Sequence, residues 1–295
     1  MKKHFALLLA FLLVSSLVAL AGDAAGAPKI LRIFKAETAP GRSATYDAAV
    51  RQVRQAVNAG KADFHWIAAR PFTGDANQIM FLTFADNFAE VERSEESFNK
   101  AAMATFQSAD FTRSIAESER SGKNIVAKLR EDLSYNLGRF DVANARHWEV
   151  SFVEVRPGYG MDFSEMEREA IDLHKRANID EVWAAYEVEY GGTPGILFLT
   201  PLRSLADLDR DLKKEHEAVF TPAIRRRFSA VAREGIAQEK SQIISVRPDL
   251  SRPTEAIVAA NPDFWTVKEE APAVAAKGKK TAKVQQAAQK SEARQ

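Results

Sequence analysis

The pattern of hydrophobic and polar residues predicts the same order of elements twice along the chain. Runs typical of strands cover residues 30–37, 64–70, 79–84 and 125–129, and then residues 148–155, 182–190, 196–200 and 243–246. After the first strand of each set, apolar residues recur at helical spacing. Longer helical patterns cover residues 86–121 and 203–239, and the second breaks before Pro222. The chain is therefore predicted to contain two βαββαβ units.

The two units are related by an internal repeat. A shift of 117 residues aligns residues 29–134 with residues 146–251 without a gap and gives 22 identities in 106 positions. The identities cluster in short blocks, which include Trp66 with Trp183 and the run 130–134 with the run 247–251. A Glu-x-x-Pro-Gly motif also follows the first strand of each unit. Clustered identities at one fixed offset indicate a duplicated unit.

The element order, the Glu-x-x-Pro-Gly loop and the segment after the third strand, residues 200–207, resemble the dimeric α/β-barrel superfamily. Its members include the antibiotic-biosynthesis-monooxygenase, EthD-like and NIPSNAP-like families. The resemblance implies an α+β fold of two fused ferredoxin-like units whose sheets lie face to face as an intrachain barrel. An open sheet with helices on one face has a second face to bury, which the other unit supplies. We therefore expect a monomer that contains its own pseudo-dimer.

The predicted domain organisation has seven parts. They are a signal peptide at 1–21, a short linker at 22–28, the first unit at 29–139, a linker at 140–146, the second unit at 147–256, a C-terminal extension at 257–267 and a disordered basic tail at 268–295.

The first 21 residues have the three parts of an export signal: Lys2 and Lys3, an apolar run and the small-residue site 19–21. We expect cleavage near Ala21, with residues 25–27 as a second possible site. The mature protein would then lie in the periplasm or outside the cell, without stable insertion in a membrane. An uncleaved membrane anchor is the alternative. Because the chain has no cysteine, it forms no disulfide and carries no lipoprotein anchor.

The charge is unevenly distributed along the chain. The net charge is +1, but the tail at 268–295 carries seven Lys or Arg residues against three Glu, so the remaining body is mildly acidic. A mildly acidic body does not favour binding of nucleic acid. The tail either contacts anionic envelope polymers or only increases solubility.

Two matched positions reverse their sign between the units. Arg32 and Arg70 of the first unit align with Glu149 and Glu187 of the second. Symmetry-related positions in a homodimer would bring like charges together, whereas a fused chain can make them complementary. Unrelated exposed charges are the alternative.

Candidate chemistry falls on the first helix of the second unit. His174 replaces Val57, and Glu167 replaces Val50. Two titratable groups beside a cleft can act as an acid–base pair. Trp183 and Tyr186 are candidate aromatic walls, although alternation along a strand lets at most one reach the cleft. The alternative is a slightly rotated helix on which both polar groups are solvated.

The other histidines carry no recognisable motif. His65 and His147 read as strand positions, and His216 reads as part of a solvated helix face. No His-x-x-x-His or His-x-His motif occurs, so no metal site is predicted. Chlorite-dismutase-like and dye-decolorising peroxidases also pair two ferredoxin-like units, and this similarity implies haem on His174 as an alternative to the absence of a cofactor.

The sequence lacks a nucleophile elbow, a phosphate-binding loop and a dinucleotide fingerprint. We expect a protein that binds a small, partly apolar ligand in a cleft between sheet and helices of the second unit. The alternatives are an oxidoreductase, either haem-dependent or cofactor-free, and a non-catalytic envelope protein. Whether the protein is an enzyme stays open at this point.

Overall fold

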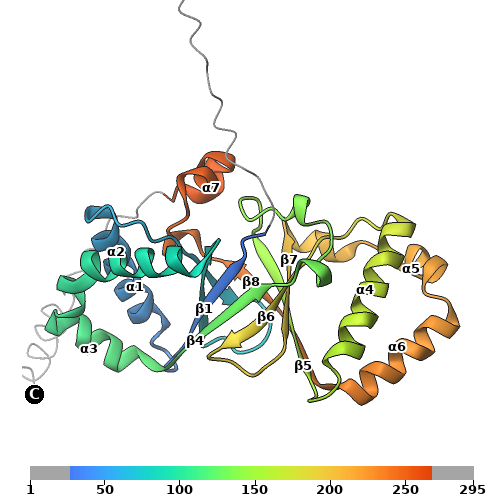
Figure 1. The fold of residues 1–295 in the computed structure, drawn as a ribbon. Coiled ribbons are helices and arrows are strands. Elements are labelled where there is room, and N and C mark those ends of the chain that lie inside the picture. The colour runs from blue at the N-terminus through green and yellow to red at the C-terminus, as the bar shows by residue number, and fades with distance from the viewer. Residues whose placement is uncertain (1–26, 268–295) are drawn as a thin grey trace, which may run out of the picture.

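The computed structural model describes residues 27–267 (Figure 1). The predicted signal peptide, most of the first linker and the basic tail lie outside the described residues. Among the helices within residues 27–267, none is long and apolar enough to cross a membrane.

The two units have the same elements in the same order. The first unit contains β1 (Ile30–Thr38), α1 (Ser43–Ala59), β2 (Ile67–Pro71), β3 (Gln78–Ala85), α2 (Phe88–Phe106), α3 (Ala109–Ser118) and β4 (Glu119–Leu129). The second contains β5 (His147–Val155), α4 (Gly160–Ala177), β6 (Ala184–Tyr190), β7 (Ile196–Leu202), α5 (Lys213–Val219), α6 (Pro222–Gly235) and β8 (Ile236–Val246). A shift of 117 residues carries β1 onto β5 and β4 onto β8, and the predicted α+β fold class is confirmed.

The eight strands form one closed barrel with the order β1-β3-β2-β8-β5-β7-β6-β4. Two antiparallel seams join the units: β2 pairs with β8, and β4 pairs with β6. The sheets therefore meet along both edges, instead of only lying face to face as the sequence analysis expected. Helices α1–α3 cover the outside of the first unit and α4–α6 that of the second (Figure 1). Closure leaves no unpaired sheet edge between the units.

Alternation along the strands separates the barrel interior from the surface beneath the helices. On β1, Leu31 and Ile33 belong to the interior core, whereas Phe34 and Ala36 pack in the cluster beneath α1. The interior is filled by side chains from all parts of the barrel, including the fully buried Trp148. The outward residues of β1 and β5 are therefore the ones available to line a site between sheet and helices.

The repeated run after β4 and β8 links the two units reciprocally. The indole N–H of Trp66 donates to the carbonyl of Leu250 at 2.7 Å, and that of Trp183 donates to the carbonyl of Leu133 at 2.9 Å. The serine that ends each run accepts a backbone N–H in the same way: Ala68 donates to Ser251, and Ala185 donates to Ser134. The best-preserved blocks of the repeat are thus the contacts that each unit makes with the other.

The reversed charges at Arg70 and Glu187 also have a structural basis. Arg130 pairs with Glu187 across the β4–β6 seam at 2.7 Å. At the other seam the matching residues are Arg247 and Arg70, which carry the same charge. Asp47 of α1 accepts a hydrogen bond from Arg70 and lies 3.4 Å from Arg247, which also pairs with Asp249 at 2.7 Å. Glu187 and Arg70 therefore each have a partner of opposite charge, as a fused chain allows.

Three elements differ from the prediction. The fourth strand of each unit begins six or seven residues earlier than its apolar pattern, at Glu119 and Ile236. These extensions carry mostly polar, exposed residues, because they are held by the backbone ladder with β1 and β5. The long helical pattern of the first unit divides at Gln107 and Ser108 into α2 and α3.

Gly191 shows how closely the β6–β7 turn approaches β4. Its backbone has φ +73°, a conformation that favours glycine. A Cβ atom added there would lie 2.0 Å from the carbonyl oxygen of Asn124. A side chain at this position would therefore push the turn away from the β4–β6 seam.

Candidate functional site

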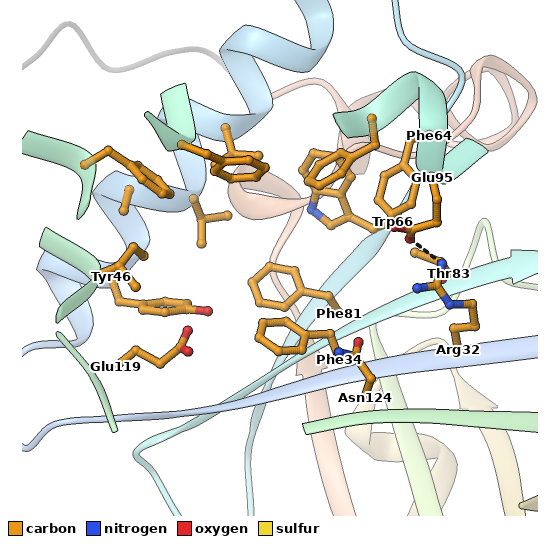
Figure 2. Close-up of a pocket in the computed structure, with 17 residues that line it drawn as sticks. Arg32, Phe34, Tyr46, Phe64, Trp66, Phe81, Thr83, Glu95, Glu119 and Asn124 are labelled. Carbon is orange, nitrogen blue, oxygen red and sulfur yellow. Dashed lines mark hydrogen bonds and ion pairs between the residues drawn. The ribbon is translucent and has the colours of Figure 1, made fainter. Parts of the chain in front are cut away.

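A cavity of about 400 Å³ lies in the first unit, between the outer face of the sheet and helices α1–α3 (Figure 2). Its wall is mostly aromatic. The rings come from β1 and β3, from the segment before β2, and from α2 and α3: Phe34, Phe81, Phe64, Trp66, Phe98, Phe106 and Phe111. Phe64 and Phe98 are in tilted contact, with ring centroids 4.5 Å apart. Aliphatic residues of α1, including Val53, close the remaining side.

Polar groups reach this cavity at separate places. At one end Arg32 forms an ion pair with Glu95, and Thr83 lies beside them (Figure 2). Elsewhere the hydroxyl of Tyr46 faces the carboxylate of Glu119 (Figure 2). Burial, together with the Glu119 charge, raises the pKa of Tyr46 well above its usual value, so its hydroxyl stays protonated.

The sequence analysis placed the ligand cleft in the second unit, where polar residues replace apolar ones. The cavity with the aromatic wall lies in the first unit, and the second unit has an open groove lined by residues that include Glu181 and His216. Beside α4, Phe220 and His216 pack on His174, with ring centroids 5.5 and 5.2 Å away.

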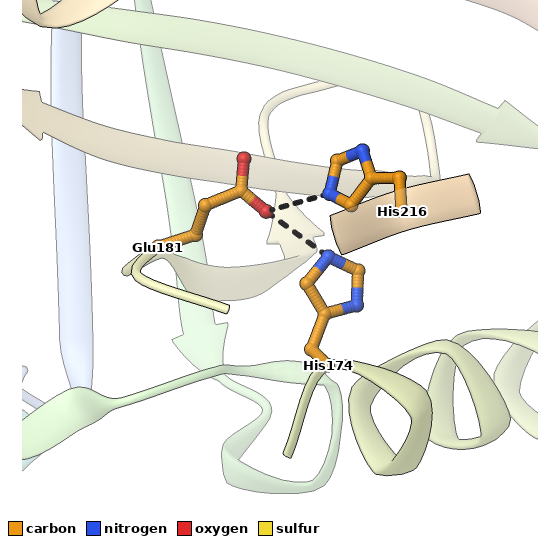
Figure 3. Close-up of side chains that lie close together, drawn as sticks. All are labelled: His174, Glu181 and His216. Carbon is orange, nitrogen blue, oxygen red and sulfur yellow. Dashed lines mark hydrogen bonds and ion pairs between the residues drawn. The ribbon is translucent and has the colours of Figure 1, made fainter. Parts of the chain in front are cut away.

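His174 belongs to a cluster with two residues that the sequence analysis did not select (Figure 3). Its Nε2 lies 3.0 Å from Oε2 of Glu181, which precedes β6, and Nε2 of His216 on α5 lies 3.4 Å from the same oxygen. One ligand atom from each residue lies within 4.8 Å of the others. His216 is therefore partly buried in a cluster, and the interpretation of a solvated helix face is wrong.

His174 itself is almost fully buried, with 8% of its surface exposed. Burial favours its neutral form, but hydrogen bonds to Glu181 and to the carbonyl of Ala170 outweigh burial and raise its pKa. Burial likewise opposes ionisation of Glu181, yet the hydrogen bond from His174 outweighs it and lowers the pKa of Glu181. The hydrogen bond between the two side chains therefore favours a protonated His174 and an ionised Glu181. The alternative of a solvated His174 does not hold.

Glu167 lies on α4, away from these hydrogen bonds. Among residues 27–267, no hydrogen bond or ion pair connects it with His174. Burial raises its pKa to about 7, and the charge of His174 counteracts this only in part. Glu167 is thus a carboxyl group with a pKa near neutral pH that interacts with His174 through charge and not through a hydrogen bond.

The two aromatic candidates separate as alternation requires. Trp183 packs on His174 in an edge-on contact, with centroids 5.1 Å apart. Tyr186 lies in the barrel interior, fully buried, and its hydroxyl donates to the carbonyl of Pro28. Tyr186 therefore does not reach the surface beneath the helices.

An open groove borders the cluster on its outer side. It is lined by Glu181 and His216 together with three cationic side chains, Arg210, Lys213 and Arg225. The sequence prediction of no metal site depended on the lack of short ligand spacings. The three candidate ligands, His174, Glu181 and His216, come from separate elements, so they form no short ligand motif in the sequence. Two histidines and one carboxylate are a donor set that suits Zn²⁺ or Fe²⁺.

The haem alternative requires a flat macrocycle against Nε2 of His174. That nitrogen faces Glu181 at 3.0 Å, and the ring is bordered by Tyr135, Trp183 and Phe220. The cavity of the first unit has room for a ligand, but its lining contains no histidine. These described residues do not fit a haem in this arrangement.

No family model and no curated protein matches the sequence. Solved structures with a similar fold include a "putative monooxygenase" from Lactobacillus acidophilus NCFM, with 10% identity, a TM-score of 0.45 and coverage of 77% of this chain and 96% of that one. Chlorite dismutase from Candidatus Nitrospira defluvii shows 8% identity, a TM-score of 0.44 and coverage of 78% and 94%. TM-scores below 0.5 say nothing about what this chain binds or catalyses.

Proposed function

We propose that the protein binds a small, partly apolar molecule with an aromatic ring in the cavity of the first unit. The observation that supports this is the cavity itself: about 400 Å³ of space between helices and sheet, with an aromatic wall and few polar groups. Pockets for small molecules combine an apolar lining with a few placed polar groups in this way. The charged groups in the lining restrict the kind of ligand further.

The polar end of the cavity favours a neutral ligand group. Arg32 already pairs with Glu95, so the pair as a whole carries no net charge. A hydroxyl or carbonyl group can exchange hydrogen bonds with this pair and with Thr83. A carboxylate would have to leave water without an uncompensated cation to meet it, which is costly. An aromatic alcohol therefore fits better than an aromatic acid of the same size.

The test is a titration with 2-naphthol and 2-naphthoate, followed by quenching of tryptophan fluorescence, because Trp66 lines the cavity. We expect 2-naphthol to bind at least about tenfold more tightly than 2-naphthoate, a difference of about 1.4 kcal/mol. Val53→Phe fills the cavity and should weaken 2-naphthol binding by a similar factor. Ala170→Phe, at the matching position of the second unit, is the control and should leave binding unchanged.

A second cavity-filling variant guards against misfolding. Ala49→Met introduces the residue that the second unit carries at Met166, and circular dichroism would verify the fold. Equal binding of 2-naphthol by the wild type and by both filled variants would contradict the proposal.

Oxidation of the bound ligand is the second candidate function. The observation that favours it is the Glu119 carboxylate beside the Tyr46 hydroxyl inside an apolar cavity (Figure 2). A carboxylate in such a position can accept a proton from a bound phenol. With the bound naphthol itself as electron donor, O2 places one oxygen atom on C1 and leaves the other as water, so that 2-naphthol becomes 1,2-naphthoquinone. Mass spectrometry after incubation with 2-naphthol in air would detect this quinone, and Glu119→Gln should abolish its formation. The closer resemblance to monooxygenase, EthD-like or NIPSNAP-like families stays a prediction.

Export is also part of the proposal, and its support is the signal pattern at residues 1–21. N-terminal sequencing of the protein from an envelope fraction should find a start near Gly22. An intact Met1 in that fraction would contradict cleavage.

A further inference from the structure

The cluster of His174, Glu181 and His216 in the second unit lies apart from the cavity of the first unit. We propose that these three side chains bind one divalent transition-metal ion, and that their donor set suits Zn²⁺. Two imidazoles and one carboxylate hold Zn²⁺ in sites that keep a fourth position open for water or another ligand.

The distances allow such a site with little movement. Metal–ligand bonds of about 2.0–2.2 Å place neighbouring ligand atoms about 3.0–3.5 Å apart. The Oε2 atom of Glu181 lies 3.0 Å from Nε2 of His174 and 3.4 Å from Nε2 of His216. All three atoms lie within 4.8 Å of one another, so a small rotation of the partly exposed His216 completes the arrangement.

His174 is oriented as a metal ligand usually is. Its Nδ1 donates to the carbonyl of Ala170 at 2.7 Å, which leaves Nε2 as the nitrogen that faces the cluster. A histidine ligand typically donates its other ring N–H to a carbonyl or carboxylate, and this bond fixes the ring. Edge-on and tilted contacts with Trp183, Tyr135 and Phe220 hold the ring further.

The first unit is an internal reference for this site. At the three matching positions it carries Val57, Phe64 and Asn99, none of which is an ionisable ligand. In the second unit all three positions carry a possible metal ligand, whereas a hydrogen-bonded pair alone would need a change at only two of them. A set of three is what a metal ion requires.

The fourth position faces the outer groove. Arg210, Lys213 and Arg225 line this groove together with Glu181 and His216. A water molecule or a small anion from solution can reach the ion from that side, whereas the rings of Tyr135, Trp183 and Phe220 surround His174 on the other. The protein would thus bind the ion from one side and leave its fourth coordination position accessible to solution.

The experiment uses the untagged chain after treatment with a chelator. Isothermal titration with Zn²⁺ should show one site per chain. Co²⁺ should give the visible absorption of a low-coordinate ion with nitrogen ligands. At a Zn²⁺ concentration one hundred times the Kd, the Tm should rise by about 5 to 10 °C.

His216→Asn, which introduces the residue of the first unit, should weaken Zn²⁺ binding at least about a hundredfold, as should Glu181→Gln.

His147→Gln is the matched control, because His147 bonds to Ser245 outside the cluster. It should leave the Kd for Zn²⁺ unchanged within about twofold. Lack of stoichiometric Zn²⁺ binding by the wild type would overturn the proposal, as would equal loss of binding in His147→Gln and His216→Asn. Binding of 2-naphthol involves the other unit, so its outcome is independent of this one.

Discussion

The two units share one backbone plan and use the space beneath their helices in opposite ways. In the first unit, aromatic rings on α2, α3 and the strands surround an open cavity. In the second unit, Glu181, His174 and His216 meet in a hydrogen-bonded cluster, and Phe220 packs on it. The residues that remain identical, such as Trp66 and Trp183, are the ones that connect the units. Contacts between the units limit change, whereas the surface beneath the helices is free to diverge.

The largest effect expected from this comparison concerns Asp47, which has no acidic counterpart in the second unit. Asp47→Ala leaves the largely buried Arg70 without its carboxylate partner, whereas Arg247 keeps Asp249. Because Arg70 and Asp47 are both largely buried, unfolding in urea should show a loss of about 3 kcal/mol. Ser164→Ala, at the matching position, should change stability by less than about 0.5 kcal/mol. Equal losses in both variants would mean that the charge arrangement is not what separates the seams.

The next effect concerns Glu167, which stands where the first unit has Val50. Its pKa of about 7 in the folded protein exceeds that of a free carboxyl. Its contribution to stability is therefore complete below about pH 4.5 and is lost as the pH rises through 7. Glu167→Gln should raise the free energy of unfolding by about 2 to 3 kcal/mol at pH 8, relative to pH 4.5. Urea titrations in a chelator at both pH values measure this, with the exposed Glu165→Gln as a control that should show no such difference.

A smaller pair of effects tests what the units have in common. Trp66→Phe and Trp183→Phe each remove one indole N–H and leave the carbonyl of Leu250 or Leu133 without that donor. Each variant should lose about 1 to 2 kcal/mol, and the two losses should agree closely. A large difference between them would show that the reciprocal contacts are not equivalent. Urea unfolding followed by circular dichroism avoids the changed fluorescence.

The smallest effect concerns His65, the one histidine of the first unit in the described residues. His65→Val introduces the residue that the second unit has at Val182. Because the His65 side chain is one-third exposed and lies outside the cluster, stability should change by about 0.5 kcal/mol. Zn²⁺ affinity should be unaltered, and a loss of affinity here would place the ion elsewhere.

The repeat made most of the fold predictable from the sequence, because a single offset located matching strands and helices in both units. The early starts of β4 and β8 were missed, since residues such as Arg120 and Lys123 carry no apolar pattern and pair through the backbone alone. The hydrophobic pattern also could not predict that the barrel closes, because closure depends on which strands of the two units pair at their edges.

The candidate site was predictable only in part. His174 and Glu167 stood out because they replace valines on a helix. Glu181 and His216 did not, because each is an ordinary polar residue until the fold brings it to His174. A comparison of all three with Val57, Phe64 and Asn99 is the signal that was available. The cavity of the first unit was not predicted. Arg32 stood out because its charge is reversed at Glu149, but nothing in the sequence showed that the aromatic residues would surround one space beside it.

The pairing of β2 with β8 also determines the order in which the protein can be completed during synthesis. Residues 69–71 pair with residues 244–246, which are among the last parts of the barrel to be made. Until they emerge, β2 has a free edge, and the apolar interior of the first unit stays uncovered. Such long-range pairing slows folding and exposes intermediates to aggregation. The first unit therefore cannot complete its part of the barrel before the end of the second unit is made.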